Sequence, residues 1–263
     1  AERLPVIGLP AELKPLATAF NAMLARLDDS FRRLSEFSSN IAHELRTPIS
    51  NLMTQTQVAL SSARDKDEYK EVLYSSLEEY ERMAQMVGDM LYLAQAENGL
   101  LNPGREQVDL ASETRDLFDY FEAWAEEHAV ALTLTGAASV VGDRLMLRRA
   151  LSNLLSNAIR HTPRGNVVQV SMSRHADTVT LAIENPGPAI PAEHLHKLFD
   201  RFYRVDPSRQ RNGDGTGLGL AICKSIVEAH GGTISVSSDD QRTRFVIALP
   251  ATLASSQWPV CGA

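Results

Sequence analysis

Two long apolar stripes at helical spacing occupy the first hundred residues, and they restrict the fold more than any other feature. Apolar side chains step by three and four residues along 12–60, the spacing of a coiled-coil seam. A second stripe of the same kind runs along 69–98. Two helices alone cannot bury both stripes, so we expect a homodimer whose long helices form an antiparallel four-helix bundle.

His43 lies on the opposite face of the first helix from its apolar seam. At 100° per residue it is rotated by about 200° from Ile41 and by about 160° from Leu45. The imidazole is therefore expected to face solvent, beside the acidic side chain of Glu44. A histidine that packs in a core would lie on the seam, so this pattern predicts a displayed histidine.

The composition is that of an ordinary soluble protein. Apolar residues make up 44% of the 263 residues and charged residues 22%. A net charge of −7 gives no reason to expect a nucleic-acid partner. Cys223 and Cys261 make no disulfide framework, and no apolar run approaches the ~20 residues of a membrane helix. Because the chain opens with Ala1 and no signal peptide, we expect a soluble piece of a longer protein.

The pattern changes after residue 104 to short strands and helices in alternation. Strands are expected at 108–110, 130–134, 140–141, 167–173, 178–184, 233–237 and 243–249. Helices are expected at 110–127, 143–159 and 218–229. This order predicts an α/β sandwich in which helices cover one face of a sheet.

Two asparagines on the second of these helices are candidate ligands of a cation. Asn153 and Asn157 are four residues apart and share a face. Carboxamide oxygens suit Mg²⁺, which prefers sites shared with phosphate oxygens, and Arg160 adds a charge that can meet a phosphate. The same asparagines could instead cap or hydrogen-bond a buried turn, and the residues alone leave both interpretations open.

A glycine-rich segment directly precedes the last of the predicted helices. Its glycines allow backbone N–H groups to approach an anion closely, and the helix terminus that follows favours negative charge. The spacing differs from a P-loop, and no clear strand precedes the segment as in a Rossmann fold. We therefore expect a phosphate loop of another kind. Its residues are Gly213, Gly215, Thr216, Gly217, Leu218 and Gly219.

Taken in order, these segments resemble four motifs of the sensor histidine kinases of two-component signalling. Residues 37–48 match the phosphoacceptor box, 153–161 the N box, 199–204 the F box and 213–220 the G2 box. The resemblance covers essentially the whole chain. Residues 184–187 and 198–211 look most like the heavy-metal (copper/silver) sensor kinases.

The resemblance implies an organisation in four parts. Residues 1–31 would be a connector and the remnant of a HAMP-like helix, and 32–101 the dimerisation and histidine phosphotransfer domain. Residues 105–250 would form the ATP-binding α/β sandwich of the histidine kinase and Hsp90-like type, and 251–263 a tail. The chain would be the cytoplasmic portion of a bacterial inner-membrane sensor, linked to the membrane only through a missing upstream segment.

The resemblance also implies a reaction. ATP would phosphorylate His43, with Glu44 acting as general base or orienting the ring. The phosphoryl group would then pass to an aspartate of a response regulator. Thr47, one turn beyond the histidine, would help to place the water that dephosphorylates that regulator.

The remaining implied site residues surround ATP and Mg²⁺. Asn153 and Asn157 would hold the metal ion, Arg160 and Arg204 would meet phosphates, and residues 190–212 would form a lid. The other implied nucleotide contacts are His161, Asn185, Gly187, Ile190 and the residues of the glycine-rich segment named above.

One departure from the family pattern keeps alternatives open. The family's adenine-binding aspartate is replaced by Asn185, whose carbonyl can still accept a hydrogen bond but carries no charge. One alternative is therefore a pseudokinase or scaffold that binds nucleotide without transferring phosphate. Another is a different ATPase of the same fold in which His43 is incidental.

Overall fold

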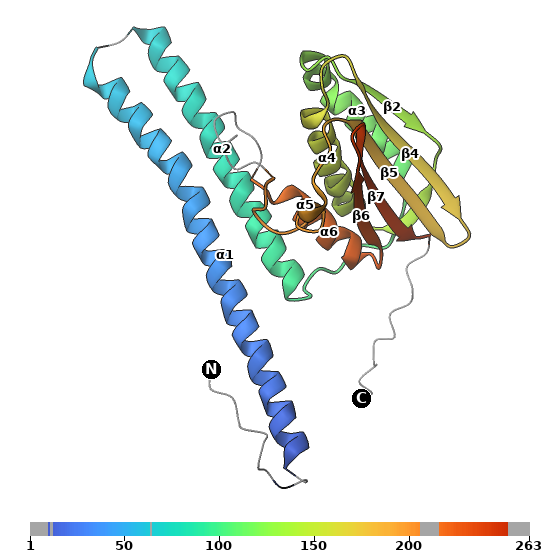
Figure 1. The fold of residues 1–263 in the computed structure, drawn as a ribbon. Helices are drawn as coiled ribbons and strands as arrows, with labels where there is room; N and C mark the ends of the chain where they lie inside the picture. Colours follow the sequence, from blue (N-terminus) through green and yellow to red (C-terminus); the bar gives the residue numbers. More distant parts are fainter. Residues whose placement is uncertain (1–9, 11–12, 64, 206–215, 252–263) are drawn as a thin grey trace. The chain divides into compact units, whose positions relative to one another are not determined.

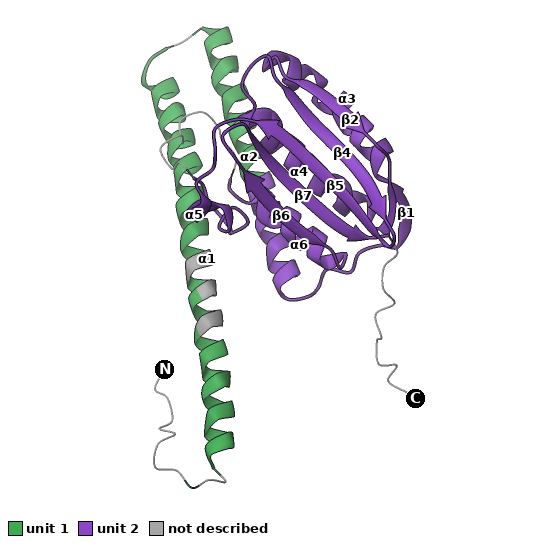
Figure 2. Cartoon of the chain, turned by 45° about the vertical axis from the view of Figure 1, so that its right-hand side comes forward, with its two compact units in different colours: residues 1–84 green, residues 85–263 purple. Residues whose placement is uncertain are grey.

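The computed structural model describes residues 10, 13–63, 65–205 and 216–251 of the 263-residue chain. The chain divides into two compact units, 1–84 and 85–263, which Figure 2 distinguishes by colour. Gly213 and Gly215, both expected in the phosphate loop, lie outside the described residues.

Helices α1 (Lys14–Ser61) and α2 (Lys66–Glu97) are the two long elements in Figure 1. Pro15 lies in the first turn of α1, where a missing backbone N–H costs nothing, and the helix runs on through Pro48. The Asp65 carboxylate starts α2 by accepting from the backbone N–H groups of Asp67 and Glu68 at 2.9 and 2.8 Å. Both helices predicted from the apolar stripes are thus confirmed.

The apolar stripe on the first turns of α1 is open to solvent in the single chain. Leu16, Phe20 and Met23 are 68%, 42% and 56% exposed. On α2, Leu73 and Leu77 are likewise 68% and 52% exposed. Stripes of this size are left without apolar cover within the described chain, as expected for helices that pair with further helices.

A five-stranded sheet forms the centre of the second unit, in the order β2–β4–β5–β7–β6. Strand β2 pairs parallel with β4, and the other neighbours are antiparallel. The strands are β2 (Ala131–Thr135), β4 (Val167–His175), β5 (Thr178–Pro186), β6 (Thr233–Ser238) and β7 (Arg242–Pro250). A separate antiparallel pair is formed by β1 (Glu106–Asp109) and β3 (Ser139–Gly142).

Three helices cover one face of the large sheet, as Figure 2 shows: α3 (Leu110–Glu127), α4 (Arg144–His161) and α6 (Gly219–Ala229). Leu154, Leu155 and Ile159 of α4 and Ile222 of α6 are wholly buried. They recur at helical spacing and pack in the core that includes Phe245 of β7. The predicted α/β sandwich is confirmed.

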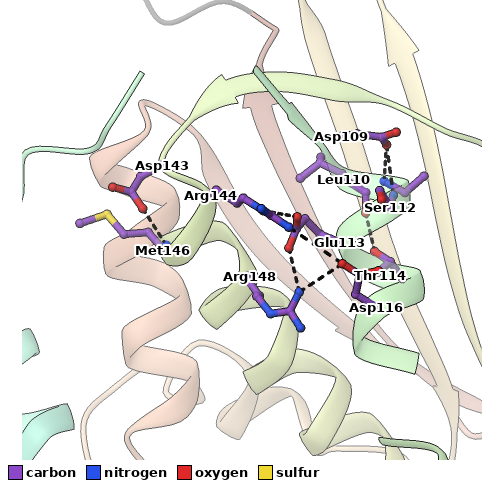
Figure 3. A network of polar contacts seen from close by, with 11 residues as sticks. Asp109, Leu110, Ser112, Glu113, Thr114, Asp116, Asp143, Arg144, Met146 and Arg148 are labelled. Atoms are coloured by element: carbon purple, nitrogen blue, oxygen red, sulfur yellow. Dashed lines mark hydrogen bonds and ion pairs between the residues drawn. The ribbon is translucent and has the colours of Figure 1, made fainter. Parts of the chain in front are cut away.

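Aspartates mark the starts of two of these helices. Asp109 accepts from the N–H groups of Ala111 and Ser112 at the start of α3. Asp143, at the start of α4, accepts from the N–H of Met146 at 3.0 Å (Figure 3) and also from that of Gly104 at 3.0 Å. The hydrogen bond from Met146 is the main reason that the pKa of Asp143 lies below its usual value.

A buried carboxylate joins α3 to α4. Glu113 is 4% exposed, and its two oxygens lie 2.5 and 3.0 Å from nitrogen atoms of Arg144 and Arg148. Figure 3 shows the two guanidinium groups facing this carboxylate. Asp116 lies further from the same guanidinium groups, at 4.0 and 3.6 Å. Each oxygen of Glu113 therefore has its own cation, which offsets the cost of burying the charge.

One short helix was not expected. Helix α5 (Ala192–Leu195) lies between the strand expected at 178–184 and the helix expected at 218–229, where neighbouring prolines and its single turn gave no periodic signal. No helix among the described residues has both the length and the apolar character to cross a membrane.

Candidate functional site

The predicted phosphoacceptor group lies within α1, in the first unit. His43 and Thr47 are exposed, one turn apart on the same helix, and Glu44 is half-buried. Within the described residues, the imidazole of His43 makes no hydrogen bond or ion pair. The displayed histidine expected from the helical pattern is therefore present, and its ring nitrogens are accessible to a reactant.

The predicted metal ligands lie on α4 in the second unit. The side-chain amide nitrogen of Asn153 donates to the carbonyl oxygen of Gly219 at 3.2 Å. This bond fixes the carboxamide and leaves its oxygen as an available acceptor. Asn157 lies one turn further along α4 and is half-buried. This hydrogen bond joins the N box directly to the end of the glycine-rich segment, although Asn153 and Gly219 are 66 residues apart in sequence.

The end of α4 meets the loop after β5. A Cβ atom at Gly187 would lie 3.3 Å from the carbonyl oxygen of His161, so only glycine fits here without displacing a neighbour. The guanidinium carbon of Arg160 is 6.0 Å from the ring centroid of Trp124 on α3. The backbone of His161 therefore lies against Gly187, and Arg160, the residue before His161, lies toward α3.

Asn185 occupies the end of β5 and is only 3% exposed. Its amide nitrogen donates to the carbonyl oxygen of Pro186 at 3.2 Å. As with Asn153, an internal bond to the nitrogen leaves the carboxamide oxygen as the group able to accept from a ligand. Ile190, a few residues on, is tied to β6 because its N–H donates to Ser238 Oγ at 3.0 Å.

The described part of the glycine-rich segment begins at Thr216. The hydroxyl oxygen of Thr216 accepts from the N–H of Leu218 at 3.4 Å, and Leu218 is fully buried as the N-cap of α6. Gly217 has a φ of +70°, a backbone conformation that favours glycine. Arg204 is half-buried just before the segment that the structure does not describe.

Two arginines that the sequence analysis did not single out hold the last turns of α2 to the ATP-binding fold. Arg149 of α4 pairs with Asp89 at 2.5 Å and covers the ring of Tyr92 at 4.3 Å. Arg201 pairs with Glu97 at 2.5 Å. Burial raises the pKa of Tyr92. A charged side chain normally indicates a solvated surface, so the sequence held no signal for these contacts.

No group of three or more His, Cys, Asp or Glu side chains within the described ranges is close enough to hold a metal ion. A cation at this site would therefore depend on amide oxygens such as those of Asn153 and Asn157, together with phosphate oxygens of a nucleotide.

Two domain families match this arrangement. Residues 33–99 match the His Kinase A (phospho-acceptor) domain, and residues 142–253 match the histidine kinase-, DNA gyrase B- and HSP90-like ATPase. A phosphoacceptor hairpin followed by an ATPase domain of this type defines a protein histidine kinase. The chain belongs to the sensor histidine kinases.

Similar proteins agree with this assignment. Sensor histidine kinase CusS of Escherichia coli (strain K12) is 56% identical over 95% of this chain and 52% of its own length. Probable sensor kinase SilS of Salmonella typhimurium is 52% identical over 94% of this chain and 51% of its own length. The chain thus spans about half the length of the curated relatives it matches.

Solved structures share the fold. Acinetobacter baumannii histidine kinase AdeS aligns with a TM-score of 0.67 and 28% identity, over 80% of this chain and 98% of that chain. Histidine kinase ThkA, solved in complex with the response regulator protein TrrA, aligns with a TM-score of 0.69 at 22% identity, over 86% of this chain and 64% of that chain. The second likeness concerns the fold alone.

Proposed function

We propose that the chain transfers the γ-phosphoryl group of ATP to His43 and then to an aspartate of a response regulator. The observation that carries this proposal is the exposed, unpartnered imidazole of His43 within a matched phosphoacceptor domain, on the same chain as a matched ATPase domain. We further propose that the chain dephosphorylates the same regulator.

In the first step a ring nitrogen of His43 attacks the γ-phosphorus of ATP. The N–P bond forms as the bond between the γ-phosphorus and the bridging oxygen breaks, and ADP leaves with that electron pair. Glu44, the next residue on α1, takes or holds the proton of the imidazole. In the phosphatase reaction, Thr47 on the same face as His43 orients the attacking water.

Three side chains of the second unit fit a nucleotide. The free carboxamide oxygen of Asn185 suits the amino group of adenine, since the amide nitrogen is already held by Pro186. The free oxygen of Asn153, with that of Asn157, suits Mg²⁺. Bound Mg²⁺ would neutralise phosphate charge, and Arg160 and Arg204 would meet the phosphate oxygens.

We propose three partners or contexts. A second copy of the chain would cover the exposed stripes of α1 and α2 in a four-helix bundle. A receiver domain of a response regulator would accept the phosphoryl group. From the resemblance of residues 184–187 and 198–211 to heavy-metal sensor kinases, we propose that the system responds to a heavy metal and is connected to the membrane by an upstream segment.

Incubation with Mg²⁺ and ATP labelled at the γ-phosphate tests the reaction. The chain should take up acid-labile, alkali-stable label, and His43→Gln should abolish it. His175→Gln, which changes an exposed histidine at the end of β4, is the matched control and should retain the label. Nucleotide binding without any label would instead favour the scaffold, the rival that the replacement of aspartate by Asn185 suggests.

A further inference from the structure

The buried histidine at the end of α6 uses both of its ring nitrogens. His230 is 1% exposed. Its Nδ1 lies 2.8 Å from the carbonyl oxygen of Ile226, which can only accept, so Nδ1 carries the proton. Its Nε2 lies 2.9 Å from the backbone nitrogen of Asp143, whose N–H can only donate, so Nε2 accepts. These two contacts fix the ring in one tautomer.

The surroundings of His230 are shaped to hold the ring in place. A Cβ atom at Gly142 would lie 2.7 Å from His230 Cδ2, so this position accepts only glycine. Gly231 has a φ of +71°, and a Cβ at Gly232 would lie 2.4 Å from the carbonyl oxygen of Ala248. The His-Gly-Gly sequence does more than stop a helix, because it leads the chain into β6 while keeping the ring against the start of α4.

Polar bonds join α4 and α6 at three levels. Asp143 bonds to His230 at one end, and Asn153 bonds to Gly219 at the other. Between them, Cys223 Sγ donates to the carbonyl oxygen of Ala150 at 3.4 Å. From the first of these bonded pairs to the last, the residue numbers rise on α4 and fall on α6, so the two helices run antiparallel. The bond of His230 thus fixes the far end of the helix pair that carries the proposed metal ligand.

We propose that His230 is a positioning residue for the nucleotide site. By locking the start of α4 to the end of α6, it keeps Asn153 and Asn157 in register with the Gly219 end of α6. The inference rests on the proposed function, because it assigns Asn153 and Asn157 to Mg²⁺ and phosphate. His230 does not touch the nucleotide itself, since its ring is buried and both nitrogens are occupied.

Replacing His230 should weaken the binding of nucleotide through its metal. His230→Leu leaves the N–H of Asp143 without its acceptor, and we expect the Kd for Mg·ATP to rise roughly tenfold. The Kd for ATP measured in EDTA should change much less, because the asparagines act on the metal-bound phosphates. His230→Gln restores a donor and an acceptor, and should recover part of the affinity.

Val227→Ala is the matched control. Val227 is fully buried on the same helix but makes no polar bond to α4, so its substitution loosens the core without removing the link. We would titrate the full chain and each variant with Mg·ATP and with metal-free ATP, and record the melting temperature of each.

The outcomes separate the two proposals. A loss specific to Mg·ATP in His230→Leu, absent from Val227→Ala at a similar loss of melting temperature, supports the positioning role. Equal losses in both variants, or equal losses with and without Mg²⁺, would overturn it while the proposed function stands. Failure of the unsubstituted chain to bind Mg·ATP would overturn the proposed function and this inference with it.

Discussion

The backbone N–H of Phe202 donates to the carbonyl oxygen of Gly217 at 3.0 Å, and both residues have positive φ, 60° and 70°. A Cβ atom at Gly217 would lie 2.9 Å from the backbone of Phe202. The end of the F box therefore lies in close backbone contact with the residues that precede α6. This contact sets the position at which the glycine-rich segment enters the helix.

Gly217→Ala should weaken ATP binding more than it destabilises the fold. The methyl group meets Phe202 and also forces alanine into a left-handed conformation, which displaces the residues that begin α6. We expect the Kd for ATP to rise about tenfold, consistent with 1–2 kcal/mol of local strain. Titration with a fluorescent ATP analogue measures the effect.

Gly165→Ala provides the control for that experiment. Gly165 also has a positive φ, +80°, but no atom lies within 4 Å of the added Cβ. It therefore carries the conformational cost without the collision. If both variants lost the same affinity for ATP, the contact with Phe202 would have no special role.

Glu113→Gln should destabilise the ATP-binding unit by about 2 kcal/mol, because a buried carboxylate that serves two arginines is replaced by a neutral group. Asp116→Asn, at an exposed position further from the same arginines, should cost less than about 0.5 kcal/mol. Urea unfolding followed by the fluorescence of Trp124, in a Trp258→Phe background, measures both. Similar losses would show that the burial of Glu113 adds nothing.

The cap at Asp143 should make the stability of the unit depend on pH. The pKa of Asp143 is lowered in the folded state, so its contribution is complete above the ordinary carboxyl pKa of about 4 and fades as pH falls through the folded value. At neutral pH, Asp143→Ala should lower the free energy of unfolding by about 1 kcal/mol. The difference in stability between this variant and the unsubstituted chain should become smaller in acid.

Asp143→Asn separates the charge from the cap. Asparagine keeps an acceptor for the N–H of Met146 but does not titrate. The difference in the free energy of unfolding between Asp143→Asn and Asp143→Ala should therefore stay nearly constant over the same pH range. Urea unfolding at a series of pH values decides this, and a gap between Asn and Ala that closes in acid would point to another titrating group.

Asn185→Ala tests the adenine end of the proposed site. Loss of the carboxamide oxygen should raise the Kd for ATP about tenfold, the effect of one buried hydrogen bond to a ligand. Binding of Mg·tripolyphosphate, which has no base, should be unchanged in a competition titration. An equal loss for both ligands would mean that Asn185 supports the loop and does not read the base.

The elements of the fold were predictable because local signals and packing agree. Asp143 stands where a helix was expected to begin, and apolar residues at helical or alternating spacing lie in the core that the structure shows. The strand expected at 108–110 ends one residue earlier, because Asp109 caps α3 and Leu110 begins it. Strand pairing was less accessible. The parallel contact between β2 and β4 joins segments separated by a helix, and no local feature encodes that choice.

The site was predictable in its residues and less so in their connections. Motifs marked Asn153 and Gly219 as site residues. Only the structure shows that the side-chain amide of Asn153 donates to the carbonyl oxygen of Gly219. No motif singled out His230, because a histidine followed by two glycines just after a predicted helix also fits the simpler role of ending that helix. The ion pair between Arg149 and the buried Asp89 could not be predicted, because a contact between helices far apart in sequence produces no periodic pattern.

Asn185 is the next-to-last residue of β5, a strand that has hydrogen-bonded neighbours on both edges. Thr216 and Gly219 instead lie where a loop becomes a helix. First-turn amides of a helix have no partner within it. The two ends of the proposed nucleotide site should therefore exchange their amide hydrogens at different rates, slowly at 183–185 and rapidly at 216–219. Added nucleotide should slow exchange chiefly at 216–219, so that the phosphate end reports occupancy while the adenine end remains a fixed reference.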